Sequence, residues 1–229
     1  MGNNGMMRAV TNRAVSRRGF LLALAAAVCA LVSSGTTAAE PLRIVAFGDS
    51  LMAGYGLAQS EGFPAKLQTA LRAKGHDVEV IDAGVSGDTA AGGLARLDWS
   101  VPKNADAVIL ELGANDALRA VNPAETRKSL DEALRRLKGR KVEVLLAGMM
   151  APPNMGGDYS STFNRIFPEL AQKHGVLLYP FFLDGVAAIE KLNQRDGIHP
   201  TAAGIDIIVE RILPSVEKLI AQTRANRKD

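Results

Sequence analysis

The sequence predicts a three-layer α/β protein in which helices cover both faces of a five-stranded parallel sheet. Short aliphatic runs alternate with longer amphipathic stretches, as in successive βα units. The runs are almost continuously apolar, which indicates strands buried on both faces. The 229 residues fit one α/β core, and no repeat or low-complexity linker divides them. The expected strands are 42–47, 77–83, 107–112, 142–148 and 176–181.

Two helices stand out between and after these strands. The first is expected over 123–139, because Asn122 can cap it, the proline that follows fits its first turn, and its leucines recur at helical spacing. Gly139 is expected to close it. The second begins near Pro200 and carries isoleucines on one face. Pro214 is expected to kink or break this last helix, because proline lacks the N–H that a helix interior uses.

The first 39 residues are expected to be a signal peptide outside the fold, which leaves a single domain over 40–229. Four arginines precede a 13-residue apolar run, and small residues follow it. The run is shorter than the roughly 20 residues that span a bilayer as a helix, so no stable membrane anchor is expected. The stretch "SRRGFLL" (16–22) resembles a twin-arginine export signal. We expect cleavage after Ala39 and a periplasmic or secreted protein.

The charge balance outside this segment gives no indication of nucleic-acid binding. The segment holds four of the 27 basic residues and none of the 24 acidic ones, so the remaining chain is close to neutral. The one cysteine, Cys29, lies in the segment as well. The mature chain is therefore expected to have no disulfide, thiol nucleophile or cysteine-based metal site.

Four polar loops are expected at one edge of the sheet. Ligands of parallel sheets bind beyond the carboxyl ends of the strands, where the connecting loops converge. Three loops directly follow the first three strands, and the fourth precedes the last helix. The loops are "GDS" (48–50), "GVSGDT" (84–89), "GAND" (113–116) and "DGIHP" (196–200).

Together these loops contain the groups that serine nucleophilic catalysis needs. The hydroxyl of Ser50 requires a base, and His199 is one whose ring Asp196 can orient from three residues away. The backbone N–H groups of Ser50 and Gly87 and the amide of Asn115 can stabilise a developing oxyanion. Alone, Ser50 would be interpreted as a helix cap, and Gly87 and Asn115 as turn residues. Their combination favours catalysis.

The same loops resemble the four sequence blocks of the SGNH or GDSL hydrolases, a family of serine esterases, thioesterases and lipases. "GDSL", "SGDT", "GAND" and "DGIHP" occur in the family's order. The resemblance implies a flavodoxin-like sheet, a nucleophile at Ser50, an oxyanion hole at Ser50, Gly87 and Asn115, and an Asp-x-x-His pair at Asp196 and His199. It implies no metal or organic cofactor.

The flanking words "VSGDT" (85–89) and "GLARL" (93–97) look closest to the periplasmic branch that includes arylesterases and the multifunctional thioesterase I, which is also a lysophospholipase. Asp82 departs from that branch, where asparagine is expected. This departure affects the hydrogen bonding of the second loop.

Other polar residues are interpreted as structural. Asp49 is expected to be a turn or cap residue. His76 and His174 lie near lysines at expected helix ends, where a cation suits the helix dipole. With His199 assigned to catalysis, too few ligands remain for a catalytic zinc site.

The residues that contact substrate are assigned from position alone. The segment 148–159 is rich in methionine, proline and glycine, so it is either an irregular surface loop or an adaptable apolar wall for an acyl chain or aromatic ring. Met150 and Pro152 would belong to that wall, and Tyr55 and the segment 118–123 would face it.

The function expected from these residues is hydrolysis of carboxylic esters or thioesters through an acyl-serine. The substrates would be small molecules such as aryl esters, short to medium acyl chains and lysophospholipids, and the chain is taken to be a monomer. A carbohydrate acetylesterase with the same triad is the alternative enzyme. A non-catalytic lipid-binding module with a flavodoxin-like sheet is the alternative of another class. The first loop lacks the lysine of a phosphate-binding loop, which counts against a nucleotide ligand.

Overall fold

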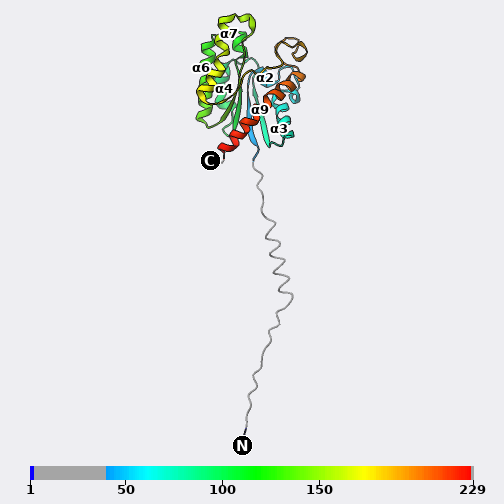
Figure 1. The fold of residues 1–229 in the computed structure, drawn as a ribbon, viewed down its shortest axis with the longest axis vertical. Coiled ribbons are helices and arrows are strands. Elements are labelled where there is room, and N and C mark those ends of the chain that lie inside the picture. The colour runs from blue at the N-terminus through cyan, green and yellow to red at the C-terminus, as the bar shows by residue number, and fades with distance from the viewer. Residues whose placement is uncertain (3–39, 228–229) are drawn as a thin grey trace. The chain divides into compact units, whose positions relative to one another are not determined.

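The computed structural model describes residues 1–2 and 40–227. The expected signal peptide thus lies outside the described residues, apart from its first two. Residues 41–227 form a five-stranded sheet with helices on both sides (Figure 1). The strands are β1 (Leu42–Gly48), β2 (Val78–Gly84), β3 (Ala107–Glu111), β4 (Glu143–Ala147) and β5 (Leu177–Tyr179).

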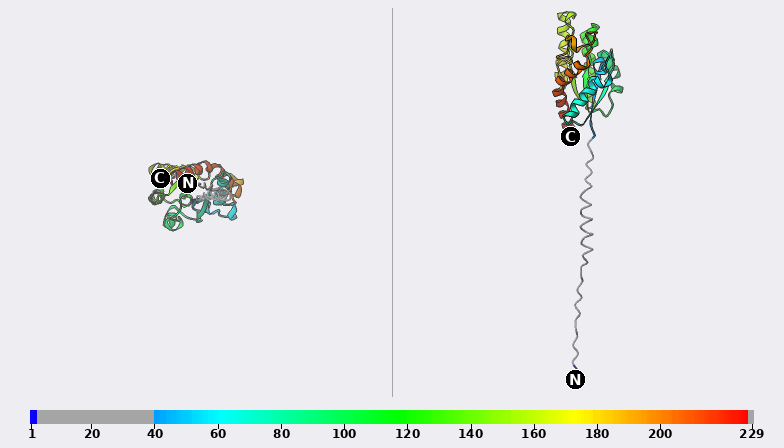
Figure 2. Two further views of the ribbon diagram at one scale, coloured as in Figure 1. Left: turned by 90° about the horizontal axis from the view of Figure 1, so that it is seen from below. Right: turned by 90° about the vertical axis from the view of Figure 1, so that its right-hand side faces the viewer.

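The helices lie between these strands and after the last one. The α-helices are α2 (Ser50–Ala53), α3 (Phe63–Ala73), α4 (Ala90–Ser100), α5 (Ala114–Leu118), α6 (Pro123–Gly139), α7 (Gly157–Asn164), α8 (Ile166–His174) and α9 (Ala202–Asn226). Three short 3-10 helices are η1 (Gln59–Glu61), η2 (Pro153–Met155) and η3 (Glu190–Leu192). Helices α3 and α9 pack together on one side of the sheet, and α4 and α6 pack together on the other (Figures 1 and 2).

The strand order is β2-β1-β3-β4-β5, and every pair is parallel. This is the expected flavodoxin-like order. The chain leaves β1 for β2 on one side and then crosses to β3 on the other. The order therefore reverses at β1, and ligands of such sheets bind at this reversal. Gly48 and Gly84 are in register at the ends of β1 and β2, so the loops that follow them begin side by side.

Burial of the central strands explains their continuous apolar runs. Every residue of β3 is buried, and six of the seven residues of β1 are. The edge strand β2 is only partly covered by helices. Its first residue, Val78, is buried, and its other six residues are partly buried or exposed. The last residue of β3 is Glu111, a carboxylic acid with no exposed surface.

One expectation about the helices needs correction. Helix α9 does not break at Pro214 but runs through it to Asn226. Pro214 and Glu210 are both exposed, so the carbonyl of Glu210 that loses its helical partner faces water. Helix α6 begins after the Asn122 cap and ends at Gly139, both as predicted. The left-handed residue beyond its end is Lys141, with φ of 58°.

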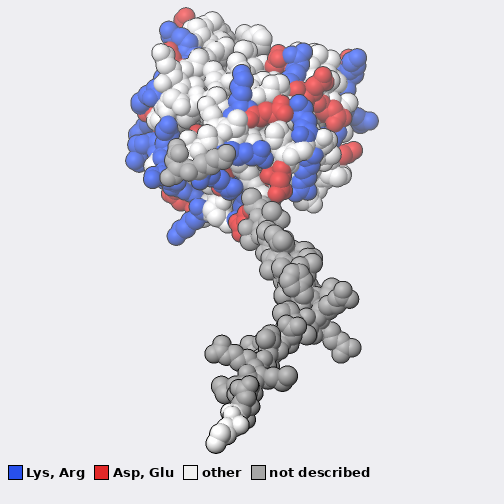
Figure 3. All heavy atoms as spheres, turned by 60° about the horizontal axis from the view of Figure 1, so that its bottom comes forward, with Lys and Arg blue, Asp and Glu red and all other residues white. Residues whose placement is uncertain are grey.

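The surface of the described residues carries both signs of charge. On the face in Figure 3, lysine and arginine side chains are interspersed with aspartate and glutamate. No helix in the described part of the chain combines the length and the apolar character that crossing a bilayer requires.

Candidate active site

Ser50 is the first residue of α2, directly beyond the end of β1. Asp49 caps this helix, because its Oδ1 accepts the N–H of Leu51 at 3.0 Å. The interpretation of Ser50 as the cap is therefore wrong, and its hydroxyl is available for other contacts. Helix α2 is only four residues long. The residue after it, Gly54, has φ of 67°, and this left-handed conformation ends the helix.

The hydroxyl of Ser50 lies against the imidazole of His199. The distance from Oγ of Ser50 to Nε2 of His199 is 2.8 Å. On the other side of the ring, Nδ1 of His199 is 2.7 Å from Oδ2 of Asp196. The structure thus brings together the three residues that the sequence suggested as nucleophile, base and orienting carboxylate. This chain of contacts leaves Nε2 free of a proton when Nδ1–H donates to Asp196.

The Asp196 carboxylate is well supplied with donors. Its Oδ1 accepts the backbone N–H groups of Ile198 and His199 at 2.9 and 3.0 Å. The hydrogen bond from the His199 ring, followed by these two backbone bonds, lowers the pKa of Asp196 to about 2. The group is therefore ionised throughout the neutral range, as an orienting carboxylate must be.

Gln194 fixes the loop that carries His199. Its backbone N–H donates to the carbonyl of His199 at 2.7 Å, and its side-chain amide donates to the carbonyls of Tyr55 and Pro200 at 2.7 and 3.0 Å. The ring of Tyr55 lies 4.5 Å from the ring of His199, centroid to centroid. Tyr55 is about half exposed, at 52%. It therefore forms part of the entrance to the site, next to the imidazole.

Two of the three expected oxyanion donors have unoccupied N–H groups. No hydrogen bond within residues 40–227 uses the backbone N–H of Ser50 or of Gly87. Gly87 has φ of 86°, a left-handed conformation that favours glycine. Its carbonyl accepts a bond from Arg119 at 3.0 Å, which fixes the orientation of this turn.

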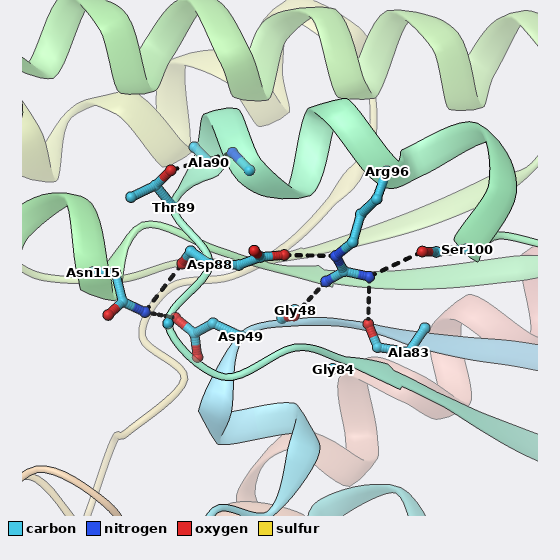
Figure 4. A network of polar contacts seen from close by, with 12 residues as sticks. Gly48, Asp49, Ala83, Gly84, Asp88, Thr89, Ala90, Arg96, Ser100 and Asn115 are labelled. Atoms are coloured by element: carbon cyan, nitrogen blue, oxygen red, sulfur yellow. Dashed lines mark hydrogen bonds and ion pairs between the residues drawn. The ribbon is translucent and has the colours of Figure 1, made fainter.

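The third expected donor, Asn115, already has acceptors for its amide. Nδ2 of Asn115 donates to Oδ2 of Asp49 at 3.1 Å and to the carbonyl of Asp88 at 3.0 Å (Figure 4). Both acceptors are chain neighbours of the other two donors, Ser50 and Gly87. Both hydrogens of the amide are thus engaged, so donation to an oxyanion requires one of them to turn from Asp49 or Asp88 to the substrate, and the oxyanion role of Asn115 stays a prediction.

Arg96 of α4 connects the ends of two strands with the loop of Gly87. Arg96 is buried, and its guanidinium lies 4.2 Å from the centre of the Phe47 ring. Its four acceptors are the carbonyls of Gly48 (2.7 Å) and Ala83 (2.9 Å), Oδ2 of Asp88 (2.5 Å) and Oγ of Ser100 (3.2 Å) (Figure 4). The guanidinium of Arg96 therefore ties the end of β1 and the end of β2 to Asp88, the residue that follows Gly87.

A pair of carboxyl groups lies beneath the nucleophile. Asp49 is fully buried, and burial raises its pKa to about 6 against the lowering effect of hydrogen bonds from Leu51, Asn115 and Glu111. Glu111 is fully buried too, and burial together with the charge of Asp49 raises its pKa well above the usual value. With a pKa of about 6, Asp49 is mostly ionised at neutral pH, whereas burial favours the protonated form of Glu111.

Asp116 and Asp82 stabilise the surrounding loops. Asp116 accepts the N–H of Ala90 at 2.8 Å and the hydroxyl of Thr126 at 2.9 Å, so it joins α5 to the starts of α4 and α6. Asp82 accepts the N–H of Gly84 at 2.9 Å. The aspartate at position 82 thus makes a local bond at the end of β2.

The other two histidines lie at helix ends, as expected, and each contacts a carboxylate there. His76 Nε2 is 3.2 Å from Glu217, and His174 Nε2 is 2.5 Å from Asp131. No group of three or more metal-binding side chains is found among residues 1–2 and 40–227.

The remaining expected contact residues occupy the same edge of the sheet. Met150 follows β4 and is 48% exposed, and Pro152 is partly exposed in the same loop. Leu118, at the end of α5, is 47% exposed. Nothing in the contacts of this structure joins Met150 or Pro152 to Ser50, so their role remains a prediction.

Sequence reasoning did not identify Arg96 and Glu111 as parts of the site. Arg96 lies in the word "GLARL", and a lone arginine in an expected helix is ordinarily interpreted as a solvated side chain. Glu111 ends the apolar run "AVILEL". A lone acid inside a strand expected to be buried on both faces is the signal that would have identified it.

Comparisons with known proteins agree with this geometry. Residues 46–207 match the GDSL-like lipase/acylhydrolase family, and the chain belongs to that family. Members of this class of proteins hydrolyse ester bonds, and this chain is an SGNH/GDSL hydrolase of that kind.

The similar proteins are bacterial esterases. The arylesterase of Vibrio mimicus is 36% identical over 199 residues, which cover 86% of this chain and 98% of that protein. The thioesterase 1/protease 1/lysophospholipase L1 of Escherichia coli K12 is 35% identical over 191 residues, which cover 83% and 89%. The crystal structure of TesA superposes with a TM-score of 0.74 at 38% identity, covering 77% of this chain and 99% of that one. The expected branch of the family is thus confirmed.

Proposed function

We propose that the protein is an exported serine esterase and thioesterase that hydrolyses small aryl and acyl esters through an acyl-enzyme at Ser50. The observation that carries the proposal is the continuous series of contacts from Oγ of Ser50 through His199 to Asp196. Similarity to an arylesterase and to a thioesterase that is also a lysophospholipase supports the substrate class.

The proposed reaction follows from the positions of these groups. Oγ of Ser50 attacks the carbonyl carbon while its proton passes to Nε2 of His199, and Asp196 stabilises the resulting imidazolium. The carbonyl oxygen becomes an oxyanion that the N–H groups of Ser50 and Gly87 and the amide of Asn115 stabilise. His199 then protonates the leaving alcohol or thiol as the carbonyl is restored. Water, activated by His199, releases the acid and regenerates Ser50.

The apolar character of the edge favours acyl and aryl substrates over acetylated sugars. Five large apolar side chains are 42–52% exposed on segments at the carboxyl end of the sheet. They are Tyr55, Val85, Leu118, Met150 and Ile198. Burying such surface against an acyl chain or ring is favourable by roughly 25 cal/mol for each Å² removed from water. A sugar acetylesterase would need polar groups there instead.

A substrate series with a labelling control tests this function. p-Nitrophenyl esters of increasing chain length, acyl thioesters and acetylated oligosaccharides are compared with the same enzyme, and a fluorophosphonate probe reports on Ser50. We expect turnover of aryl esters and thioesters, and labelling that Ser50→Ala and His199→Ala abolish. Activity confined to acetylated sugars would establish the alternative enzyme. Tight lipid binding without labelling would establish the binding module.

Export is a separate part of the proposal and has its own test. Residues 1–39 fused to a reporter that is active only outside the cytoplasm should deliver it, with cleavage after Ala39. Replacing both Arg17 and Arg18 by lysine should stop delivery if the twin-arginine route is used. A fused reporter that stays in the cytoplasm would contradict export.

A further inference from the structure

The buried acid Glu111 has no role in the reaction described above. It is the last residue of β3 and has no exposed surface. Its Oε2 accepts the backbone N–H of Asp49 at 3.4 Å, a long bond, and its Oε1 has no hydrogen-bond partner at all. Asp49 immediately precedes Ser50. An acid in this position costs stability, so its presence points to a contribution from the carboxyl group itself.

The partners of the two acids indicate where the proton is. Oε2 of Glu111 accepts the N–H of Asp49, so the two buried carboxyl groups are neighbours, and a hydrogen bond between them requires that one of them carries a proton. Asp49 also accepts N–H groups from Leu51 and Asn115. Glu111 has one weak donor and one oxygen without any. Negative charge is therefore better stabilised on Asp49, and the proton belongs to Glu111.

Among residues 40–227, no free cation lies beside Asp49 and Glu111 to neutralise a second negative charge. The guanidinium of Arg96 is bound to the carbonyls of Gly48 and Ala83 and to the carboxylate of Asp88. His199 is the other ionisable group whose charge acts on Asp49, and its ring is engaged with Ser50 and Asp196. The ionisable groups that face Asp49 are thus Glu111 from β3 and His199 from the loop before α9.

We propose that Glu111 is a positioning residue that stays protonated while the enzyme works, donates its O–H to Asp49, and thereby keeps Asp49 ionised as the acceptor for the Asn115 amide. The proposal rests on the proposed reaction at Ser50. The structure shows the second part of this arrangement, in which the amide of Asn115 donates to both Asp49 and the Asp88 carbonyl. Removing the first donor weakens the acceptor that holds the oxyanion amide.

The consequence for catalysis is a dependence on pH that a purely structural residue would not produce. Burial already brings the pKa of Asp49 to about 6, and the hydrogen bond from Glu111 is one of the interactions that lower it. Without that bond Asp49 takes up a proton at higher pH. A neutral Asp49 is a weaker acceptor, so the amide of Asn115 is less well held and the oxyanion is less stabilised.

Two substitutions separate the hydrogen bond from the volume of the side chain. Glu111→Gln keeps a neutral donor, whereas Glu111→Leu keeps approximate volume and removes it. With an aryl ester, we expect Glu111→Gln to retain kcat within about threefold, and Glu111→Leu to lose about tenfold at neutral pH with KM unchanged. The acid limb of kcat in Glu111→Leu should move up by about one pH unit, so that activity recovers in alkali. An unshifted limb in Glu111→Leu would overturn the proposal, and so would equal losses in both variants.

An infrared measurement keeps the proposal testable even if Glu111→Leu does not fold. At about pH 8, above the usual range for a carboxylic acid, the wild-type protein should show the carbonyl stretch of a protonated carboxyl group. Glu111→Gln should lack that band, and Glu79→Gln on the exposed side of β2 should keep it. A band that is absent from the wild type, or unchanged in Glu111→Gln, would show that Glu111 is ionised. This readout needs no turnover, so its failure is distinct from a failure of Ser50 to react with the fluorophosphonate.

Discussion

Oγ of Ser50 and Nε2 of His199 lie 2.8 Å apart, although 149 residues separate them in the chain. They meet because the end of β1 and the loop before α9 lie at the same edge of the sheet. Gln194 fixes that loop to the carbonyl of Tyr55, just beyond α2. The contact is thus produced by strand order together with one side-chain amide.

The Asp196–His199 contact predicts a large effect of a small substitution. In Asp196→Asn the amide can present an N–H to Nδ1, which favours the tautomer with its proton on Nε2, facing Ser50. We expect kcat for an aryl ester to fall by roughly 10⁴ with little change in KM. Asp184→Asn, which alters an exposed ion pair with Arg211, is the control and should be nearly silent. A loss below about tenfold in Asp196→Asn would contradict the orienting role.

Because the pKa of Asp196 is about 2, its own titration should not limit activity at mildly acidic pH.

The position of Asn115 predicts a defect in turnover without a defect in binding. Asn115→Ala removes an amide that Asp49 and Asp88 hold beside the donors of Ser50 and Gly87. We expect a loss of about 10² to 10³ in kcat, the usual effect of removing one oxyanion donor. Steady-state kinetics and circular dichroism would measure turnover and fold. Near-normal turnover would remove Asn115 from the mechanism.

Arg96 is expected to matter for stability as well as activity. Arg96→Ala removes the guanidinium donor from the carboxylate of Asp88 and from the carbonyls of Gly48 and Ala83, of which Gly48 keeps the N–H of Val85. Losing one partner of a buried pair costs about 3–5 kcal/mol, and we expect a decrease of this size in the free energy of unfolding by urea. The matched control is Arg135→Ala, since Arg135 pairs with Glu132 on the surface. That variant should change stability by less than about 1 kcal/mol; equal effects in both would refute the role given to Arg96.

The close approach of α2 to β2 can be tested at one glycine. A Cβ on Gly84 would lie 2.2 Å from the backbone nitrogen of Ala53, so Gly84→Ala has to displace the helix that carries Ser50. We expect a destabilisation of roughly 1–3 kcal/mol together with reduced turnover. Gly139→Ala is the comparison, because a Cβ there meets nothing within 4 Å. If both alanine variants unfolded at the same urea concentration as the wild type, this packing would not constrain the site.

The raised pKa of Asp49 predicts how stability depends on pH. The folded protein keeps the Asp49 proton up to about pH 6, whereas the ordinary value is 3.8. Between these values the folded state binds more protons than the unfolded state, so this group's contribution to stability falls as pH rises. The loss amounts to about 3 kcal/mol, at about 1.4 kcal/mol per pKa unit.

Asp49→Asn removes this titration and isolates its effect. Relative to the wild type, the variant should gain up to about 3 kcal/mol as pH rises from about 4 to about 7, while losing turnover because the Asn115 amide loses its anionic acceptor. Urea unfolding of both proteins at several pH values measures the difference. A difference that stays constant over this range would show that Asp49 has an ordinary pKa in the folded protein.

Sequence reasoning located the ends of all five strands to within one or two residues, and it placed both ends of α6 correctly. It could do so because aliphatic runs, capping residues and turn glycines determine the backbone conformation of residues close to them in the chain. It failed at Pro214 because the cost of a lost helical bond depends on whether the freed carbonyl faces water, and that depends on packing. It also left Asp49 as a simple cap, since nothing local reveals that an amide 66 residues away binds its carboxylate.

The order of the four loops along the chain, the residue types in them and the alternation of strands and helices were determined by the sequence alone. Tertiary structure decided that Glu111 lies beneath Asp49, that Arg96 joins two strand ends, and that the amide of Asn115 has two acceptors. These contacts link residues far apart in the chain. Burial, which raises the pKa of a carboxyl group and gives a hydrogen bond its strength, exists only once the layers have packed.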